Sequence, residues 1–410
     1  MNKKERMRKR RITVSEYIFI WGIIFAPMQA LRVFKFGPGE ILLILWMMTV
    51  FFKKGHSSHG IVFNAINKYQ LANLLMMILG MLVDIIIYGT RTRMSALVTD
   101  YLSHLFMFLL SISILNMFLD TEIDDINHVL SKIVVWGACV YGAMLLYGMY
   151  ISGSLFGIRL WMSGNTRFIG LTTNPHQLGM ITGTGLFFSL YLMSTEISII
   201  KKCFFLIIAG IWFWVSSSLK SDTMTVSYVI CLASFLFLKT SKIEKNPLAR
   251  RRNFVILTFF LIIEGLALSG KLVGILSDFI SEAGNGEDRL VIWQTGFGQL
   301  LEKPLGFITG LGPGSHTGRY MLSGNEIEAH NTYVQLVLDA GVFICIYYII
   351  TLFRIIKHPF AKNTYLILSV LYFALYGFGG NMNRRVLVWF TYTMVGIIFN
   401  KTEGTKISQV

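Results

Sequence analysis

The chain has 410 residues, of which 54% are hydrophobic and only 14% are charged, and its mean hydropathy is +0.59. Because a soluble domain averages about 25% charged residues, this composition excludes a soluble globular enzyme and indicates a protein with many membrane spans. The formal net charge of +15 is expected from lysine and arginine kept in cytoplasmic loops, and no polar domain is basic enough to bind nucleic acid.

The N-terminus carries seven basic residues before Ile12, and an apolar run follows it. No small-x-small cleavage site follows that run, so we interpret it as a retained first span with a cytoplasmic N-terminus. The sequence predicts an all-α polytopic membrane protein, a single domain over 1–410, with about twelve transmembrane helices. These spans are 16–32, 38–52, 69–89, 96–119, 132–152, 178–195, 203–218, 223–239, 253–269, 332–354, 364–379 and 386–400.

The distribution of basic residues gives the expected topology. With the N-terminus inside, 24 of the 37 Lys and Arg residues fall on the cytoplasmic side and 13 on the other side, as the positive-inside rule requires. Both termini are then cytoplasmic. The segment 270–331, between the ninth and tenth spans, becomes one large extracytoplasmic loop.

Arginines on the outer face depart from this rule and suggest a ligand. Arginine binds phosphate oxygens through two N–H groups at once, which lysine cannot do, so the set favours a lipid phosphate or diphosphate at the membrane boundary. The alternative is that each arginine reaches the lipid headgroups or pairs with a nearby carboxylate. The set comprises Arg91, Arg93, Arg159, Arg167, Arg289, Arg319, Arg384 and Arg385.

The outer loop contains a predicted amphipathic helix over 286–303, which begins with Glu287 and Asp288 and ends at Lys303-Pro304. Leucine and aromatic residues, Trp293 among them, recur on one face at helical spacing. Arg289 lies in the first turn beside free backbone N–H groups, where an anion is favoured; a surface ion pair is the alternative. The glycine-rich turn around Gly312 permits close approach of a ligand to the backbone, but it is more often a tight turn.

His330 stands at the outer end of the tenth predicted span. Histidine is suited to proton transfer near neutral pH, and Glu328 or Asn331 could orient its ring. An exposed or structural histidine is the alternative. A second outer segment, 153–178, contains Arg167 and then Asn174-Pro175, which is typical of a turn that leads into a helix.

Several polar residues lie within predicted spans, and we expect them to face the bundle because exposure to lipid is costly. They are Asp84, Asp100, His104, Glu264 and Asp339. Structural hydrogen bonding is favoured over proton or ion transport, since no paired pattern emerges. The sequence contains no internal repeat, which weakens a transporter built from two similar halves. The four cysteines stand singly in apolar segments, so no metal site is expected.

Three motifs occur in order along 167–341. The first consists of Arg167-Phe168-Ile169-Gly170 and then Asn174-Pro175-His176. The second consists of Arg289, Trp293, Pro304 and the glycine turn with Gly312. The third consists of His330-Asn331-Thr332-Tyr333 and then Asp339-Ala340-Gly341. As an ordered set they resemble the O-antigen ligase and O-antigen polymerase superfamily.

The sequence departs from that family pattern at three places. His176 stands where the family commonly has asparagine, and Asp339 replaces a frequent glutamate. The stretch 219–222 stands near the place where many members carry Ser-Arg, so one basic contact of the family is not established here.

The resemblance implies a metal-independent, inverting glycosyltransferase without a cofactor, which takes a glycan from undecaprenyl diphosphate. Arg167 and Arg289 would bind the diphosphate, and His330 would be the general base on the acceptor hydroxyl. Asn174, Glu328, Asn331, Trp293 and Gly312 would support them.

The family implies a multi-pass protein of the bacterial plasma membrane, with its active site facing the periplasm or the exterior. Its partners would be the lipid-linked oligosaccharide, the glycan acceptor and membrane lipids, with a flippase and a chain-length regulator as further candidates. A repeat-unit polymerase is slightly favoured over a ligase. A transporter or flippase and a non-catalytic scaffold for envelope assembly are the alternatives from other classes.

Overall fold

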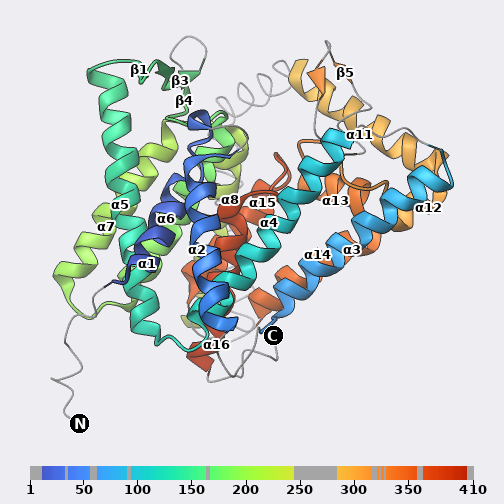
Figure 1. Cartoon of the computed structure of the whole chain (residues 1–410). Coiled ribbons are helices and arrows are strands. Elements are labelled where there is room, and N and C mark those ends of the chain that lie inside the picture. The colour runs from blue at the N-terminus through green and yellow to red at the C-terminus, as the bar shows by residue number, and fades with distance from the viewer. Residues whose placement is uncertain are drawn as a thin grey trace.

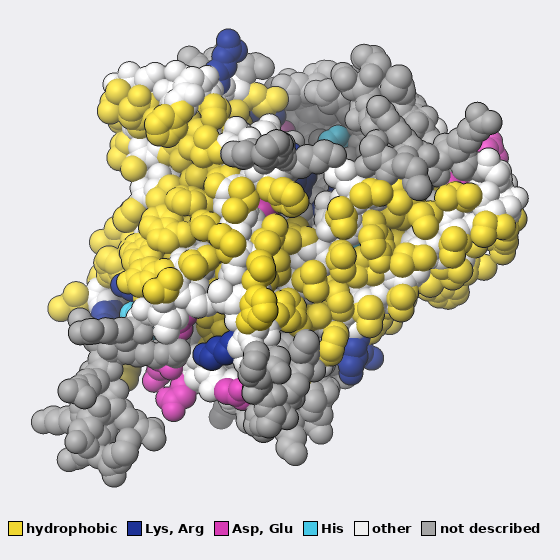
Figure 2. All heavy atoms as spheres, in the orientation of Figure 1, with side chains coloured by type: hydrophobic (Ala, Val, Ile, Leu, Met, Phe, Trp, Pro, Cys, Tyr) yellow, Lys and Arg dark blue, Asp and Glu magenta, His cyan; other side chains and the backbone are white. Residues whose placement is uncertain are grey.

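A computed structural model describes residues 12–32, 36–55, 62–89, 94–162, 167–243, 284–314, 321–322, 325–326, 329–357 and 363–403. Over these ranges the chain is mostly helical, and the helices pack side by side in a bundle (Figure 1). Within the described residues, five helices are long and apolar enough to cross a membrane: Ala65–Ile86, Leu97–Phe118, Ile123–Tyr150, Pro175–Thr195 and Ile199–Ser217. Hydrophobic side chains cover the middle of the face in Figure 2, and most described charged side chains visible there lie toward its two ends. The protein is a helical membrane protein.

The first half of the chain forms a run of helices. They are α1 (Val14–Phe25), the 3-10 turn η1 (Gln29–Leu31), α2 (Pro38–Gly55), α3 (Ala65–Ile86), α4 (Met94–Phe118), α5 (Ile123–Tyr150), α6 (Pro175–Thr195), α7 (Ile199–Ser217) and α8 (Asp222–Ile243). The second half adds α11 (Gly284–Glu302), α12 (Pro304–Thr309), α13 (Thr332–Ala340), α14 (Val342–Lys357), α15 (Thr364–Tyr376) and α16 (Val386–Glu403).

Three short antiparallel hairpins accompany the helices and were not expected from the sequence. They pair β1 (Ser154–Leu155) with β2 (Ile158–Arg159), β3 (Trp161–Met162) with β4 (Arg167–Phe168), and β5 (Met321–Leu322) with β6 (Asn325–Glu326). All three lie at the end of the bundle that also carries α11, uppermost in Figure 1. We call this the hairpin end.

Asparagine begins four of the helices, which explains where they start. Asn64, Asn174, Asn331 and Asn363 precede α3, α6, α13 and α15, and each side-chain oxygen accepts a hydrogen bond from a backbone N–H in the first turn. Such caps satisfy N–H groups that the helix itself leaves unpaired. The caps at Asn174 and Asn331 fix two segments of the candidate site.

The predicted helix 286–303 is confirmed as α11, but the tenth predicted span, 332–354, was wrong as one continuous helix. Gly341 has φ +87° and separates α13 from α14. Only glycine fits there, because a side chain would overlap the carbonyl of Ile308 in α12. The backbone N–H groups of Leu311 and Gly312 then bind the carbonyls of Leu338 (2.8 Å) and Asp339 (3.1 Å). The ninth predicted span, 253–269, and most of the remaining outer loop lie outside the described residues.

Glycines also permit close packing around α6, as small residues do between membrane helices. A side chain at Gly183 would overlap the Tyr372 ring, and one at Gly185 would overlap Trp212. The contacts bring α15 and α7 against α6, and they place the end of α15 beside the start of α6.

A buried ion pair anchors α12 to α3. Lys303 Nζ lies 2.6 Å from Asp84 Oδ1, and the Asp84 side chain is fully buried. The Tyr88 hydroxyl accepts a hydrogen bond from the backbone N–H of Leu305 at 3.1 Å, and Gly80 leaves room for the backbone at Thr309. The expectation that Asp84 faces the bundle is therefore confirmed.

We expect Lys303→Met to destabilise the protein by about 3–5 kcal/mol, because it leaves a fully buried carboxylate without its ammonium partner. The free energy of unfolding in detergent micelles measures this. The double variant Asp84→Leu/Lys303→Met should recover most of the loss, since apolar replacements of a buried pair are often tolerated. A single variant as stable as the wild type would contradict the assignment.

Candidate functional site

The loop 377–385, between α15 and α16, connects the elements of the candidate site. Thr332, the first residue of α13, is fully buried against this loop. Its backbone N–H donates to the Gly377 carbonyl at 2.8 Å. Its hydroxyl donates to the Gly380 carbonyl at 2.8 Å and accepts from the Met382 N–H at 2.9 Å. The start of α13 and the loop therefore form one hydrogen-bonded unit.

His330 lies immediately before this unit in a strained backbone conformation. Its φ is +48°, a region that residues other than glycine seldom occupy and that recurs at functional sites. Phe156 and Lys220 share it among the described residues. Ala329, on one side, is fully buried and its carbonyl accepts a hydrogen bond from Trp293 Nε1 at 2.7 Å. His330 itself is partly buried, so it is held in place while keeping access to solvent.

Asn331, on the other side of His330, acts differently from the expectation that it orients the histidine ring. Its side-chain oxygen accepts from the N–H groups of Tyr333 (2.9 Å) and Val334 (3.1 Å), and its Nδ2 donates to the Phe378 carbonyl at 3.3 Å. Both ends of the amide are therefore occupied by backbone groups. Asn331 positions His330 through the main chain.

A second histidine reaches the same loop from α6. Asn174 accepts from the backbone N–H of His176 at 2.8 Å, which fixes the first turn of the helix. His176 Nδ1 lies 2.9 Å from the hydroxyl of Tyr376, the residue that precedes the loop. Gly179 permits the approach of Tyr376, because a side chain there would contact the Tyr376 hydroxyl at 2.7 Å.

The loop ends in two adjacent arginines with different surroundings. Arg384 forms an ion pair with Asp100 of α4. Burial of the guanidinium, and then the like charge of Arg385, lower the pKa of Arg384 to about 9, while the Asp100 carboxylate acts in the opposite direction. Arg384 therefore remains a cation at neutral pH. In contrast, Arg385 Nε is buried without a hydrogen-bond partner among the described residues.

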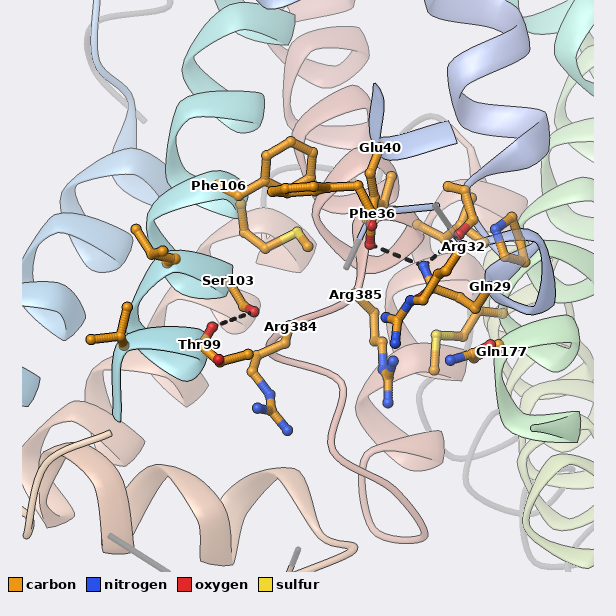
Figure 3. A pocket seen from close by; sticks show the side chains of 18 residues that line it. Gln29, Arg32, Phe36, Glu40, Thr99, Ser103, Phe106, Gln177, Arg384 and Arg385 are labelled. Carbon is orange, nitrogen blue, oxygen red and sulfur yellow. Dashed lines mark hydrogen bonds between the residues drawn. The ribbon is translucent and has the colours of Figure 1, made fainter. Parts of the chain in front are cut away.

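Both arginines line a cavity of about 650 Å³ at the hairpin end of the bundle. Its walls come from the α1–α2 connection, the first half of α4, the start of α6 and the residues around the start of α16. Figure 3 shows Arg384 and Arg385 extending in the same direction. Arg32 adds a third positive charge to the lining, and the apolar side chains include Phe36, Val98, Leu102 and Phe106.

The α1–α2 connection contributes an acceptor side to the cavity. Glu40 accepts hydrogen bonds from Gln29 Nε2 at 2.9 Å and from the Gly37 N–H at 2.8 Å. Gln29 Nε2 also donates to the Ala26 carbonyl at 3.2 Å. Gln29 is 6% exposed, and its Oε1 is buried with no partner among the described residues. The cavity therefore combines cationic donors with an unused acceptor.

The residues predicted from the sequence are only partly brought together. His330 and Asn331 are adjacent, and Trp293 bonds to the Ala329 carbonyl beside them. Asn174 joins them through His176 and Tyr376. Gly312 has φ +85° and packs against Met81 of α3, so its part is structural.

Neither of the two arginines predicted to bind the diphosphate is found in the described lining of the cavity. One lies in a hairpin, and the side chain of the other is outside the described residues. Arg167 lies in β4 opposite Met162, and the next residue, Phe168, donates its N–H to the Ser218 carbonyl at 3.0 Å. Arg167 is absent from the described lining of the cavity. Arg289 lies in α11, but its side chain is outside the described residues, as is Glu328 altogether.

Sequence reasoning did not single out Gln29 and Glu40, and it noted Arg384 and Arg385 only within the larger arginine set. The available signal was an adjacent pair of arginines directly before the last apolar segment. No comparable signal marks Gln29. Among the described residues, no group of three or more His, Cys, Asp or Glu side chains could hold a metal ion.

No protein-family model matches the chain, and no curated protein or solved structure does either. The candidate site is therefore interpreted from its own geometry.

Thr332→Val tests the link between α13 and the loop. It keeps the shape of the side chain but leaves the Gly380 carbonyl and the Met382 N–H unpaired, at about 1–3 kcal/mol for each buried group. Thr393→Val is the matched control, because Thr393 is fully buried and its hydroxyl has no partner among the described residues. Unfolding in micelles should show a clear loss for Thr332→Val and little change for Thr393→Val; equal losses would contradict the assignment.

Proposed function

We propose that this protein is a metal-independent, inverting glycosyltransferase. It moves a glycan from an undecaprenyl-diphosphate donor to an acceptor hydroxyl at the outer face of the bacterial plasma membrane. The reaction most consistent with the motifs is polymerisation of repeat units of an O-antigen or capsule polysaccharide. This proposal rests on the ordered motifs along 167–341 and on the chemistry of the site.

One observation carries the proposal: the segment with His330 and the arginines of the cavity share one short loop. The hydrogen bonds of Thr332 hold the His330 segment to residues 377–382 of that loop. Arg384 and Arg385, which line the cavity, are the last two residues of the same loop. A proton acceptor and a set of fixed cations are the two things that transfer from a diphosphate needs. A non-catalytic scaffold would need neither.

The chemistry follows from these groups. The acceptor hydroxyl attacks the anomeric carbon from the side opposite the diphosphate, which inverts the configuration of that carbon. His330 takes the hydroxyl proton as the oxygen–carbon bond forms. The bond to the diphosphate breaks, and fixed guanidinium groups stabilise the charge that develops on the leaving oxygen. Because the donor already carries its activated bond, the reaction needs no nucleotide and suits a site outside the cell.

The proposed orientation has both termini in the cytoplasm and the hairpin end outside. The distribution of Lys and Arg supports it, as does the position of His330 and the arginine-lined cavity at that end. The donor would reach the site after a flippase has carried it across the membrane, and a chain-length regulator would act on the growing polymer.

A ligase that transfers the glycan to lipid A-core or another acceptor is the second candidate, because the same motifs and the same groups serve it. A transporter is less well supported. It would not require a histidine held in a strained conformation, and the two halves of the sequence do not match.

We expect His330→Ala to abolish transfer in cells that still make and flip the lipid-linked unit. Glycan length and attachment measure the result. Loss of long chains with one unit still attached identifies a polymerase, and loss of all attachment identifies a ligase.

His128→Ala is the matched control, since His128 is an exposed histidine near the start of α5, at the opposite end of that helix from the β1–β2 hairpin. It should leave the glycan unchanged. Normal length and attachment in His330→Ala, at normal protein level, would refute the transferase proposal.

A further inference from the structure

We propose that Arg385 and Gln29 form a two-part subsite for a glycosyl phosphate, in which Arg385 binds a phosphate oxygen and Gln29 Oε1 accepts a hydrogen bond from a sugar hydroxyl. The place of this subsite in a reaction rests on the proposed function, where it would receive the sugar–phosphate junction of the donor. The binding itself follows from the cavity alone.

Arg384 and Arg385 differ in their partners. Arg384 is compensated by Asp100, and this ion pair joins the loop to α4. The Arg385 side chain lacks a described carboxylate partner, and its Nε is buried without a hydrogen bond among the described residues. The Arg385 side chain as a whole is partly buried, and an anion can accept hydrogen bonds from the fork of donors of a guanidinium. Arg385 is thus a cation of the cavity wall that is available to a phosphate.

Of the Gln29 amide, only the oxygen is left without a partner among the described residues. Its nitrogen is used twice, by Glu40 at 2.9 Å and by the Ala26 carbonyl at 3.2 Å. The opposite amide orientation would face the Glu40 carboxylate with an oxygen and lose both bonds. Because Gln29 is 94% buried, with a relative exposure of 6%, its unpaired Oε1 requires a donor. A sugar hydroxyl supplies one, whereas a bare phosphate at neutral pH mainly offers acceptors.

The two unpaired groups define the class of ligand together. One site asks for an anion and the other for a hydrogen-bond donor, and both belong to a single cavity of about 650 Å³. That size is within the range of small-molecule sites. A phosphate ester of a sugar satisfies both groups at once, and neither phosphate nor a neutral sugar does so alone.

The test uses the purified full chain in detergent, with glucose 1-phosphate, cyclohexyl phosphate, inorganic phosphate and glucose as probes in a titration. Cyclohexyl phosphate has a ring and a phosphate but no hydroxyl on the ring. We expect the wild type to bind glucose 1-phosphate about tenfold more tightly than cyclohexyl phosphate or inorganic phosphate, and to bind glucose least. Equal affinity for the two esters, or no binding of either at millimolar concentration, would overturn the proposal without any variant.

Variants then test which residue binds the phosphate and which binds the sugar hydroxyl. Arg385→Gln should weaken both esters by about tenfold or more, while Arg32→Gln, at an exposed arginine of the same cavity, should weaken them less. Gln29→Met should remove the preference for glucose 1-phosphate over cyclohexyl phosphate. Its control is Gln177→Met. Gln177 also lines the cavity, but its Oε1 already accepts from the N–H and hydroxyl of Thr173 at 3.3 Å.

The outcomes separate this inference from the proposed function. If glycan transfer survives His330→Ala while the expected binding results hold, the protein has a sugar-phosphate site but is not the proposed transferase. If transfer depends on His330 while Gln29→Met leaves the preference between the esters unchanged, the subsite is wrong and the transferase proposal stands.

Discussion

The hydroxyl of Thr332 is the contact on which the candidate site depends. It bridges the Gly380 carbonyl and the Met382 N–H, in a position where the side chain is fully buried. The helix α13 is short, Thr332–Ala340, and hydrogen bonds near both of its ends fix its direction. By joining α13 to the loop before α16, this one side chain sets His330 and the paired arginines in a common frame.

Two buried charges in this bundle are paired with residues far away in the sequence. The two ion pairs hold the segments on either side of the candidate site. Lys303 reaches Asp84 on α3, and Arg384 reaches Asp100 on α4. Each charge would be costly if exposed to lipid alone, so each pair specifies which segments must meet. The first pair fixes α12 and the turn behind α13, and the second fixes the loop that leads into α16. The two pairs therefore fix the described segments on either side of the candidate site.

Many of the helices could be predicted from the sequence, because apolar periodicity and the residues that begin and end a helix are local features. The helix α11 and the inward-facing carboxylates at Asp84 and Asp100 are examples. The break at Gly341 could not be predicted, since it arises from the approach of the Ile308 carbonyl, a contact between distant segments. The cavity could not be predicted from the sequence either, because Gln29, Arg385 and Gln177 come from three distant parts of the chain. Asn331 was singled out correctly as a neighbour of His330, but its amide serves the backbone.

The adjacent arginines have different surroundings: Arg384 is paired with Asp100, and Arg385 is the residue proposed to bind a ligand. Because consecutive residues in a non-helical stretch need not face the same partner, Arg384 can be neutralised by Asp100 while Arg385 keeps its donors. Replacing the first would loosen the loop, and replacing the second would remove charge from the cavity with less effect on the fold. In the proposed subsite Arg385 would bind the anion, and the ion pair of Arg384 with Asp100 would fix the backbone that carries Arg385.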